Sequence, residues 1–150
     1  MASVFSRIIS GEFPGTFAWA DERCVAMATI APISDGHLMV VPRNEVVSFT
    51  RADDDLLAHL IGVSAIIGRA QEQAFDGCRA ALIIAGFEVP HLHLHVIPAW
   101  GEAQLSFENA RHDASPDELA EATERVRQAL NDQGHGAFVP TDISNPGIAS

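Results

Sequence analysis

Three histidines stand at every second position in the segment HLHLHVI, which begins at His91 and ends at Ile97. Strict alternation with apolar residues is the two-residue period of a β-strand, so the pattern predicts that His91, His93 and His95 share one face. Successive histidine Cα atoms would lie about 6.5 Å apart on that face. The apolar residues between them would pack into a core on the opposite face. The segment therefore predicts a strand with one chemically reactive face and one buried face.

A histidine-bearing strand face fits two kinds of chemistry. Imidazoles can bind zinc and leave an open coordination position for water. They can also exchange protons near neutral pH, or attack as nucleophiles and form covalent intermediates. A turn at Gly86 would place the backbone N–H groups of Glu88 and Val89 near a phosphoryl oxygen. No acidic residue lies within the strand to support a bound metal, so the pattern favours group transfer over a metal site.

The overall composition limits the partners that the chain can have. Its 150 residues, 47% of them hydrophobic, predict one ordinary globular domain. The formal net charge is −11 and only 9 Lys and Arg residues are present, so we expect no nucleic-acid partner. No apolar run is long enough for a signal peptide or a membrane span, which predicts a soluble, cytoplasmic protein that binds no membrane. Cys24 and Cys78 are expected to be reduced, buried thiols.

Periodicity and turn residues predict an α+β fold with an antiparallel sheet of about five strands. The expected strands cover residues 17–20, 24–30, 37–42, 79–85 and the histidine segment, and the strand at 79–85 is expected to be buried. The clearest helix runs from about Asp53 to Phe75, because its apolar residues step by four and three along one face. Shorter helices are expected over 4–10 and from Ser115, where Ser-Pro-Asp-Glu supplies an N-cap, a first-turn proline and a capping-box glutamate. From Asn131 onward, frequent turn residues predict a surface tail.

Three segments resemble the histidine triad family, which is named for a His-x-His-x-His pattern with an apolar residue at each x. VFSRIISGEFPG resembles the family's opening helix, GHLMVVPR resembles its GHxLVxP strand segment, and EVPHLHLHVIP resembles the triad itself. The resemblance covers about residues 4–98. It implies a histidine triad catalytic domain over residues 1–110, with a C-terminal helix and surface tail of the same domain over 111–150. It also implies a homodimer.

The resemblance implies that the chain binds a purine nucleotide or a nucleotide conjugate and hydrolyses or transfers its nucleotidyl group. His93 would attack the α-phosphorus, and water would then open the covalent nucleotidyl-histidine. His95 would contact the phosphoryl oxygens or the leaving group. His91 and His37 would continue a hydrogen-bonded relay that sets the tautomer of His93, since an imidazole attacks through one nitrogen only if the other holds its proton. This chemistry requires no metal and no cofactor.

The nucleotide pocket that the resemblance implies combines an apolar base site with a phosphate-binding turn. Its expected residues are Val4, Phe5, Ile8, Met27, Thr29, Ile30, Met39, Gly86, Glu88 and Val89. The apolar members of this set would be ordinary core residues in any fold, so packing is the competing interpretation of their role.

Four departures from the family pattern bear on activity. Thr29 stands where an acidic residue often holds the ribose hydroxyls, and Phe87 stands where a glutamine often follows the turn glycine. An asparagine that contacts substrate from the preceding strand is missing. Ser3, Ser6 and Glu45 stand where some members bind a structural zinc. These departures predict reduced or altered nucleotide specificity.

Three functional hypotheses follow from these observations. The first is a phosphoramidase or nucleotidyl hydrolase or transferase, the second is a catalytically weak nucleotide-binding or regulatory protein of the same fold, and the third is a zinc hydrolase that uses the strand histidines. The remaining histidines are expected to be solvated, His59 on the surface of the long helix and His112 and His135 in polar loops. Trp100 is expected to pack rather than to cover the site.

Overall fold

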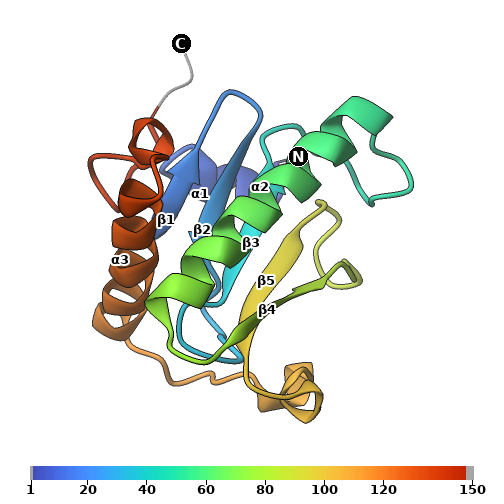
Figure 1. Ribbon diagram of the computed structural model, residues 1–150. Helices are drawn as coiled ribbons and strands as arrows, with labels where there is room; N and C mark the ends of the chain where they lie inside the picture. The colour runs from blue at the N-terminus through green and yellow to red at the C-terminus, as the bar shows by residue number, and fades with distance from the viewer. Residues whose placement is uncertain (1, 148–150) are drawn as a thin grey trace.

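One antiparallel sheet of five strands organises the computed structural model, which describes residues 2–147 (Figure 1). The strands are β1 (Phe17–Ala20), β2 (Cys24–Ala28), β3 (Leu38–Pro42), β4 (Arg79–Ile83) and β5 (Leu94–Ala99). Their order across the sheet is β1-β2-β3-β5-β4, and every neighbouring pair is antiparallel. The predicted α+β class and strand number are confirmed.

Within residues 2–147, three α-helices accompany the sheet. They are α1 (Val4–Ile9), α2 (Asp54–Ala74) and α3 (Pro116–Asp132), and three short 3-10 helices cover Glu102–Gln104, Phe107–Asn109 and Gly136–Phe138. Asp53 caps α2 by accepting a hydrogen bond from the N–H of Leu56. Ser115 and Glu118 form the predicted capping box at the start of α3. The helix boundaries thus follow local side-chain chemistry that satisfies the free N–H groups of the first turn.

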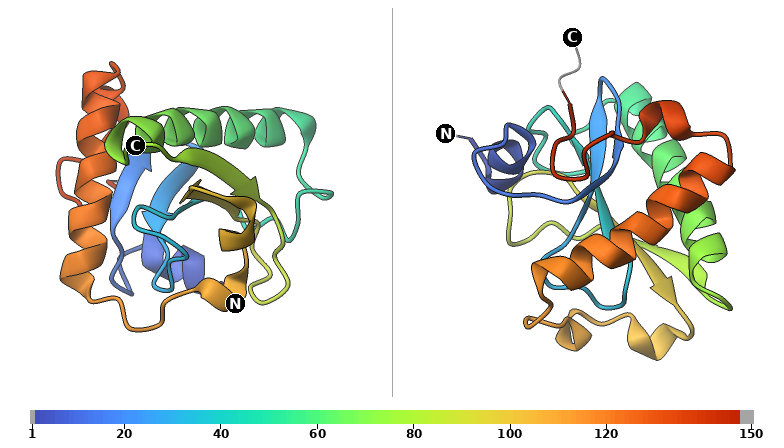
Figure 2. Two further views of the ribbon diagram at one scale, coloured as in Figure 1. Left: turned by 60° about the horizontal axis from the view of Figure 1, so that its bottom comes forward. Right: turned by 90° about the vertical axis from the view of Figure 1, so that its left-hand side faces the viewer.

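The two faces of the sheet pack against different helices (Figure 2). On one face, the apolar stripe of α2 and the inner side of α3 form the larger core. Leu92, Leu94 and Val96 contribute to that core, as the alternation predicts. On the other face, α1 lies over a smaller cluster in which Phe5 packs with the apolar side chains of β1, β2 and β3. The alternating histidines belong to this second face, beneath α1.

The apolar strand β4 was expected to be buried, and this prediction is wrong. β4 lies at the edge of the sheet and pairs only with β5. Its residues are half-buried or exposed, and Leu82 has 43% of its surface exposed. A run of apolar residues indicates a strand but does not distinguish a central strand from an edge strand, because that difference depends on which strands are its neighbours in space.

The C-terminal segment packs on the sheet instead of forming a simple surface tail. The ring of Phe138 stacks on Trp19 of β1, with the ring centroids 4.7 Å apart. The N–H of Phe17 donates to the carbonyl oxygen of Ile143 over 2.7 Å. The segment therefore covers the outer edge of β1, which would otherwise expose unpaired backbone groups.

Two further expectations concern the cysteines and the membrane. Cys24 and Cys78 are both free, as predicted, although only Cys24 is fully buried and Cys78 is half-buried. Across residues 2–147, no helix has the length and apolarity needed to cross a bilayer.

Candidate active site

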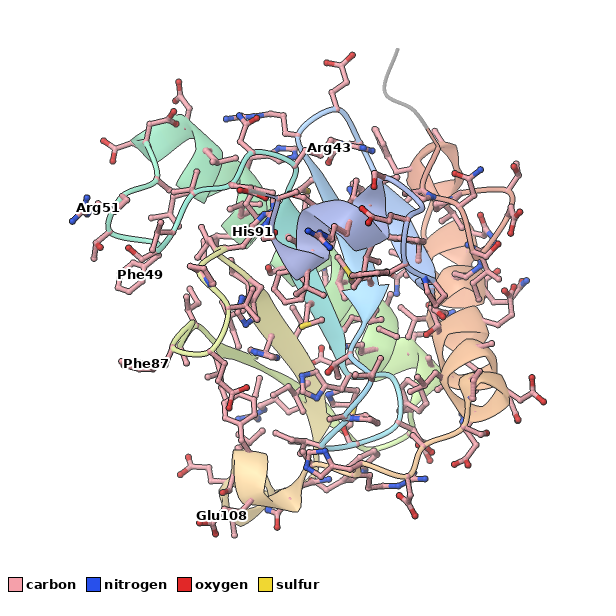
Figure 3. All side chains as sticks on the ribbon, turned by 180° about the vertical axis from the view of Figure 1, so that it is seen from behind. Arg43, Phe49, Arg51, Phe87, His91 and Glu108 are labelled. Carbon is pink, nitrogen blue, oxygen red and sulfur yellow. The ribbon has the colours of Figure 1, made fainter. Side chains whose placement is uncertain are left out.

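The four histidines of the predicted site come from two neighbouring segments of the sheet. His37 immediately precedes β3, and His95 lies on β5 opposite Met39. His91 and His93 lie just before β5, so only one of the three alternating histidines is in the paired strand. The antiparallel pairing of β3 and β5 nevertheless brings all four imidazoles into one buried group, in which Phe5 of α1 packs on His91 and His93. Figure 3 shows the labelled His91 beside that helix.

The hydrogen bond of His93 determines which of its ring nitrogens is free to react. Its Nδ1 lies 2.7 Å from the carbonyl oxygen of His91, and a carbonyl only accepts, so Nδ1 carries the proton. The neutral ring then has an unprotonated Nε2 with an available lone pair. The side chain is 8% exposed, and the Phe5 ring packs edge-on against it with the centroids 4.8 Å apart. Burial lowers the pKa of His93, which favours the neutral form.

A second chain of hydrogen bonds fixes the tautomer of His95. The backbone N–H of Ile33 donates to Nδ1 of His37 over 3.0 Å, so the proton of neutral His37 is on Nε2. That Nε2 lies 2.9 Å from Nδ1 of His95 and donates to it. Neutral His95 must then carry its own proton on Nε2. Burial lowers the pKa of His37 to about 3 and that of His95 to about 4, so both rings are neutral at physiological pH.

His91 supports the site through its backbone, because hydrogen bonds hold both of its ring nitrogens. Nε2 donates to the carbonyl oxygen of Pro42 over 2.7 Å, and Nδ1 accepts from Ser3 Oγ over 2.6 Å. In the predicted relay, His91 does contact His93, but through its backbone, whereas the predicted link from His37 to His93 is wrong. The backbone carbonyl of His91 contacts His93, and His37 contacts His95 instead.

The first turn of α1 is tied to the site by a cluster of polar side chains. Ser6 Oγ donates to Glu45 Oε1 over 2.7 Å, and the N–H of Ser3 donates to the same carboxylate oxygen. These two donors lower the pKa of Glu45 to about 2. Ser3, Ser6 and Glu45, which stand at the zinc positions of some family members, thus form a hydrogen-bonded group that ends on His91.

The predicted nucleotide-binding residues divide into three sets by burial. Phe5, Met27 and Met39 are buried in the cluster under α1, with Ile8 and Val89 half-buried against it. Thr29 is also buried, and its hydroxyl accepts from the N–H of Ala31. Val4, Ile30 and Glu88 are exposed, and Gly86 has φ +80° in the turn before the histidines. Because Met27 is 1% exposed, it lies behind the surface that a ligand would touch.

Two residues near the histidines were missed in the sequence. Gln71 of α2 is fully buried, and its Nε2 donates to the carbonyl oxygens of Gly36 and Val96 over 2.9 and 2.8 Å. These two carbonyls adjoin His37 and His95 in sequence, so Gln71 fixes the spacing of the two segments that carry the rings. The Phe107 ring packs edge-on against His95 with the centroids 4.9 Å apart. A polar glutamine among the apolar core positions of a helix was the signal that could have identified Gln71. No sequence pattern marked Phe107.

The other candidate residues lie outside this group. Trp100 is more than half exposed and its indole N–H donates to the carbonyl oxygen of Asp76, so it anchors a loop. His112 is exposed. His135 packs near Trp19, and His59 is half-buried against Asp21 rather than free on the surface as predicted.

The arrangement does not favour the zinc-hydrolase hypothesis. Within the part of the chain that the structure describes, the three strand histidines do not form a group of three converging donor atoms. Both nitrogens of His91 and the Nδ1 atoms of His93 and His95 are already in hydrogen bonds. The rings of His93 and His95 are adjacent, with their centroids 5.0 Å apart, and the Nε2 atom of each lies outside these hydrogen bonds.

Comparison with known proteins agrees with this geometry. The family model described as HIT domain matches residues 10–101. An uncharacterized HIT-like protein of Mycobacterium tuberculosis is 34% identical over 146 residues, which cover 91% of this chain and 99% of that protein. The fold resembles a zinc-bound histidine triad family protein from Mycobacterium smegmatis, with TM-score 0.77, 28% identity and coverage of 91% and 98% of the two chains. It also resembles a hypothetical histidine triad nucleotide-binding protein from Sulfolobus tokodaii, with TM-score 0.71, 28% identity and coverage of 85% and 91%.

Proposed function

Because the chain belongs to the histidine triad family, we propose that it hydrolyses or transfers the nucleoside monophosphate part of a small nucleotide conjugate through a covalent intermediate on His93. The observation that carries this proposal is the 2.7 Å contact between His93 Nδ1 and the carbonyl oxygen of His91. It leaves an unprotonated nitrogen on the only triad histidine whose Nδ1 proton is held by backbone. Such a nitrogen is a competent nucleophile for phosphoryl transfer.

In the first step, His93 Nε2 bonds to the α-phosphorus while the bond from phosphorus to the leaving group breaks. The positive charge that develops on the imidazole is stabilised through Nδ1–H by the carbonyl dipole of His91. In the second step, water attacks the same phosphorus, the bond to Nε2 breaks, and His93 returns to its neutral form. When another acceptor replaces water, the same intermediate gives transfer instead of hydrolysis.

His95 is proposed to hold the phosphoryl group during both steps. Its Nε2–H is free to donate to a phosphoryl oxygen or to the leaving group. The N–H of Ile33 fixes the tautomer of His37, whose Nε2–H donates to Nδ1 of His95, so the proton of neutral His95 stays on Nε2. A donor that is already oriented before the reaction needs no reorganisation as negative charge develops on oxygen.

The base of the nucleotide is proposed to bind at the apolar cluster beneath α1, next to Phe5, which contacts both His91 and His93. The phosphate would lie against the turn at Gly86, which has positive φ and open space around its Cα. Ribose recognition differs from the usual family pattern, because Thr29 already accepts a backbone N–H and presents no carboxylate. We therefore expect weak discrimination between ribose and deoxyribose conjugates.

We also propose a homodimer that uses the edge strand β4. The strand is apolar yet exposed, and an unpaired apolar edge is a template for pairing with a second chain. A second copy would add its own β4 and continue the sheet. Light scattering of Leu82→Glu should show the monomer mass, whereas Ile61→Glu on the exposed side of α2 should keep the dimer mass.

A nucleotide-binding protein with little turnover is the second candidate. It is favoured by Phe87, which has 97% of its surface exposed and projects away from the body of the molecule in Figure 3. In this position the side chain does not reach a substrate phosphate as a polar residue could. Affinity for nucleotides without hydrolysis of any conjugate would support this candidate over the enzyme.

The experiment that separates the two candidates is steady-state hydrolysis of fluorogenic adenosine and guanosine 5′-phosphoramidates. We expect turnover by the natural chain and none by His93→Ala, with nucleotide affinity retained in the variant. Equal turnover by both proteins would contradict the role given to His93. Nucleotide affinity with no turnover by the natural chain would favour the binding protein.

A further inference from the structure

Three metal-binding side chains meet on the face of the sheet opposite the triad. They are Asp21 from the turn between β1 and β2, Cys24 at the start of β2, and His59 from α2. One donor atom from each lies within 4.8 Å of the other two. Asp21 Oδ2 is 2.8 Å from His59 Nε2 and 3.5 Å from Cys24 Sγ. Cys24 belongs to the core under α2, whereas the triad contacts the cluster under α1.

The carboxylate of Asp21 is held in position without help from His59. Its Oδ1 accepts from the N–H groups of Arg23 and Cys24 over 2.7 and 2.9 Å. Its Oδ2 accepts from the indole N–H of Trp19 over 2.8 Å. A carboxylate has about four lone-pair positions, so one position on Oδ2 remains. That position faces His59 Nε2 and the Cys24 thiol.

We propose that Asp21 Oδ2, Cys24 Sγ and His59 Nε2 bind one divalent transition-metal ion of the zinc class. Carboxylate, thiolate and imidazole are the ligands that zinc takes in proteins, and water would complete a four-coordinate site. On binding, the thiol proton of Cys24 leaves to solvent, and the single proton of neutral His59 moves from Nε2 to Nδ1 by exchange with solvent, so that Nε2 presents its lone pair to the ion. The indole of Trp19 keeps its bond to Oδ2 and orients the ligand, as outer-shell donors do in metal sites.

The position of the three residues gives this ion a structural role. It would join the β1–β2 turn to the first half of α2, which are separated by more than 30 residues in the chain. The ion can enter beside His59, whose side chain is 31% exposed. The site is distinct from the cluster of Ser3, Ser6 and Glu45, which lies on the α1 side and contains no thiol.

Cobalt(II) titration of the untagged protein tests the proposal, because a thiolate bound to cobalt gives a charge-transfer absorption in the near ultraviolet. We expect this absorption to saturate at one equivalent of CoCl₂ and to disappear when ZnCl₂ is added. Cys24→Ser should abolish it, whereas the matched variant Cys78→Ser should keep it. His93→Ala should also keep it, which excludes cobalt binding at the triad as its source.

Two further variants keep the test decisive if Cys24→Ser does not fold. His59→Ala changes a half-exposed side chain, and Trp19→Phe removes only the outer-shell donor while keeping a ring to stack on Phe138. We expect Trp19→Phe to weaken cobalt binding roughly 10- to 100-fold, and His59→Ala to weaken it further. Absence of thiolate absorption in the natural chain, or the same affinity in His59→Ala, would overturn the proposal.

Discussion

The Nδ1 atom of His93 lies 2.7 Å from the carbonyl oxygen of His91, two residues earlier in the chain. The local backbone before β5 therefore places the proton of neutral His93 on Nδ1 and leaves Nε2 unprotonated, as the proposed nucleophile requires. The ring of His91 is anchored in turn by Pro42 and by Ser3, so the position of that carbonyl depends on β3 and on α1. The geometry of the site therefore depends on the hydrogen bonds that hold the segment before β5 to β3 and to the start of α1.

The pH dependence of turnover follows from the lowered pKa of His93. Its burial disfavours the imidazolium, so the nucleophile stays neutral as the pH falls through the ordinary histidine value of about 6.5. We expect kcat/KM to stay constant from about pH 8 to 6.5 and to fall only in more acidic solution. A profile measured with a phosphoramidate in constant ionic strength checks this. An acid limb centred at or above the ordinary histidine value would contradict it.

The stability of the fold should decrease in acid because of His37 and His95. Their pKa values in the folded state are about 3 and about 4, below the ordinary value of 6.5 that an unfolded chain has. Between pH 6.5 and these lowered pKa values, the unfolded chain binds protons that the folded chain does not. The free energy of unfolding therefore decreases as the pH decreases. Urea unfolding from pH 7 to 4 measures this slope. His37→Gln should reduce the slope, since it removes one of the two groups.

The hydrogen bond from His37 to His95 should affect turnover more than nucleotide binding. His37→Gln can still accept from the N–H of Ile33 and donate to Nδ1 of His95, whereas His37→Leu can do neither. We expect His37→Leu to lower kcat by about 100-fold with a small change in KM, and His37→Gln to retain most of kcat. Equal losses in the two variants would show that the imidazole acts in another way.

Gln71 should stabilise the fold because it satisfies two buried carbonyl groups. Gln71→Leu leaves the carbonyls of Gly36 and Val96 without this donor, so we expect a loss of about 2 kcal/mol in the free energy of unfolding. Gln73→Leu, at an exposed position of the same helix, should change it by less than about 0.5 kcal/mol. Urea unfolding of the three proteins is the measurement. Equal stability of the two variants would refute the role given to Gln71.

Features that depend on local chemistry could be predicted from the sequence. The histidine alternation predicted that the histidines and the apolar residues between them lie on opposite faces, because side-chain direction in an extended chain depends only on the two-residue period. The capping box at Ser115 was predicted for a similar reason, since it involves residues three positions apart.

Features that depend on contacts between distant segments could not be predicted. The edge position of β4 depends on which strands are its neighbours. The contact of His59 with Asp21 joins residues 38 positions apart, and no local pattern marks it. The link from His37 was also predicted wrongly, because it leads to His95 and not to His93. The tautomers of these rings are fixed by backbone groups of His91 and Ile33, which carry no sequence signal.

Direct detection of a nucleotidyl group on His93 tests the central claim. The purified protein would be mixed with an adenosine 5′-phosphoramidate and stopped during turnover in alkaline denaturant, which preserves a phosphorus–nitrogen bond. Peptide mass spectrometry would then locate the adduct. The account predicts an adenylate mass on the peptide that contains His93, at that ring, and none in His93→Ala. Turnover without an adduct, or an adduct on another residue, would contradict it.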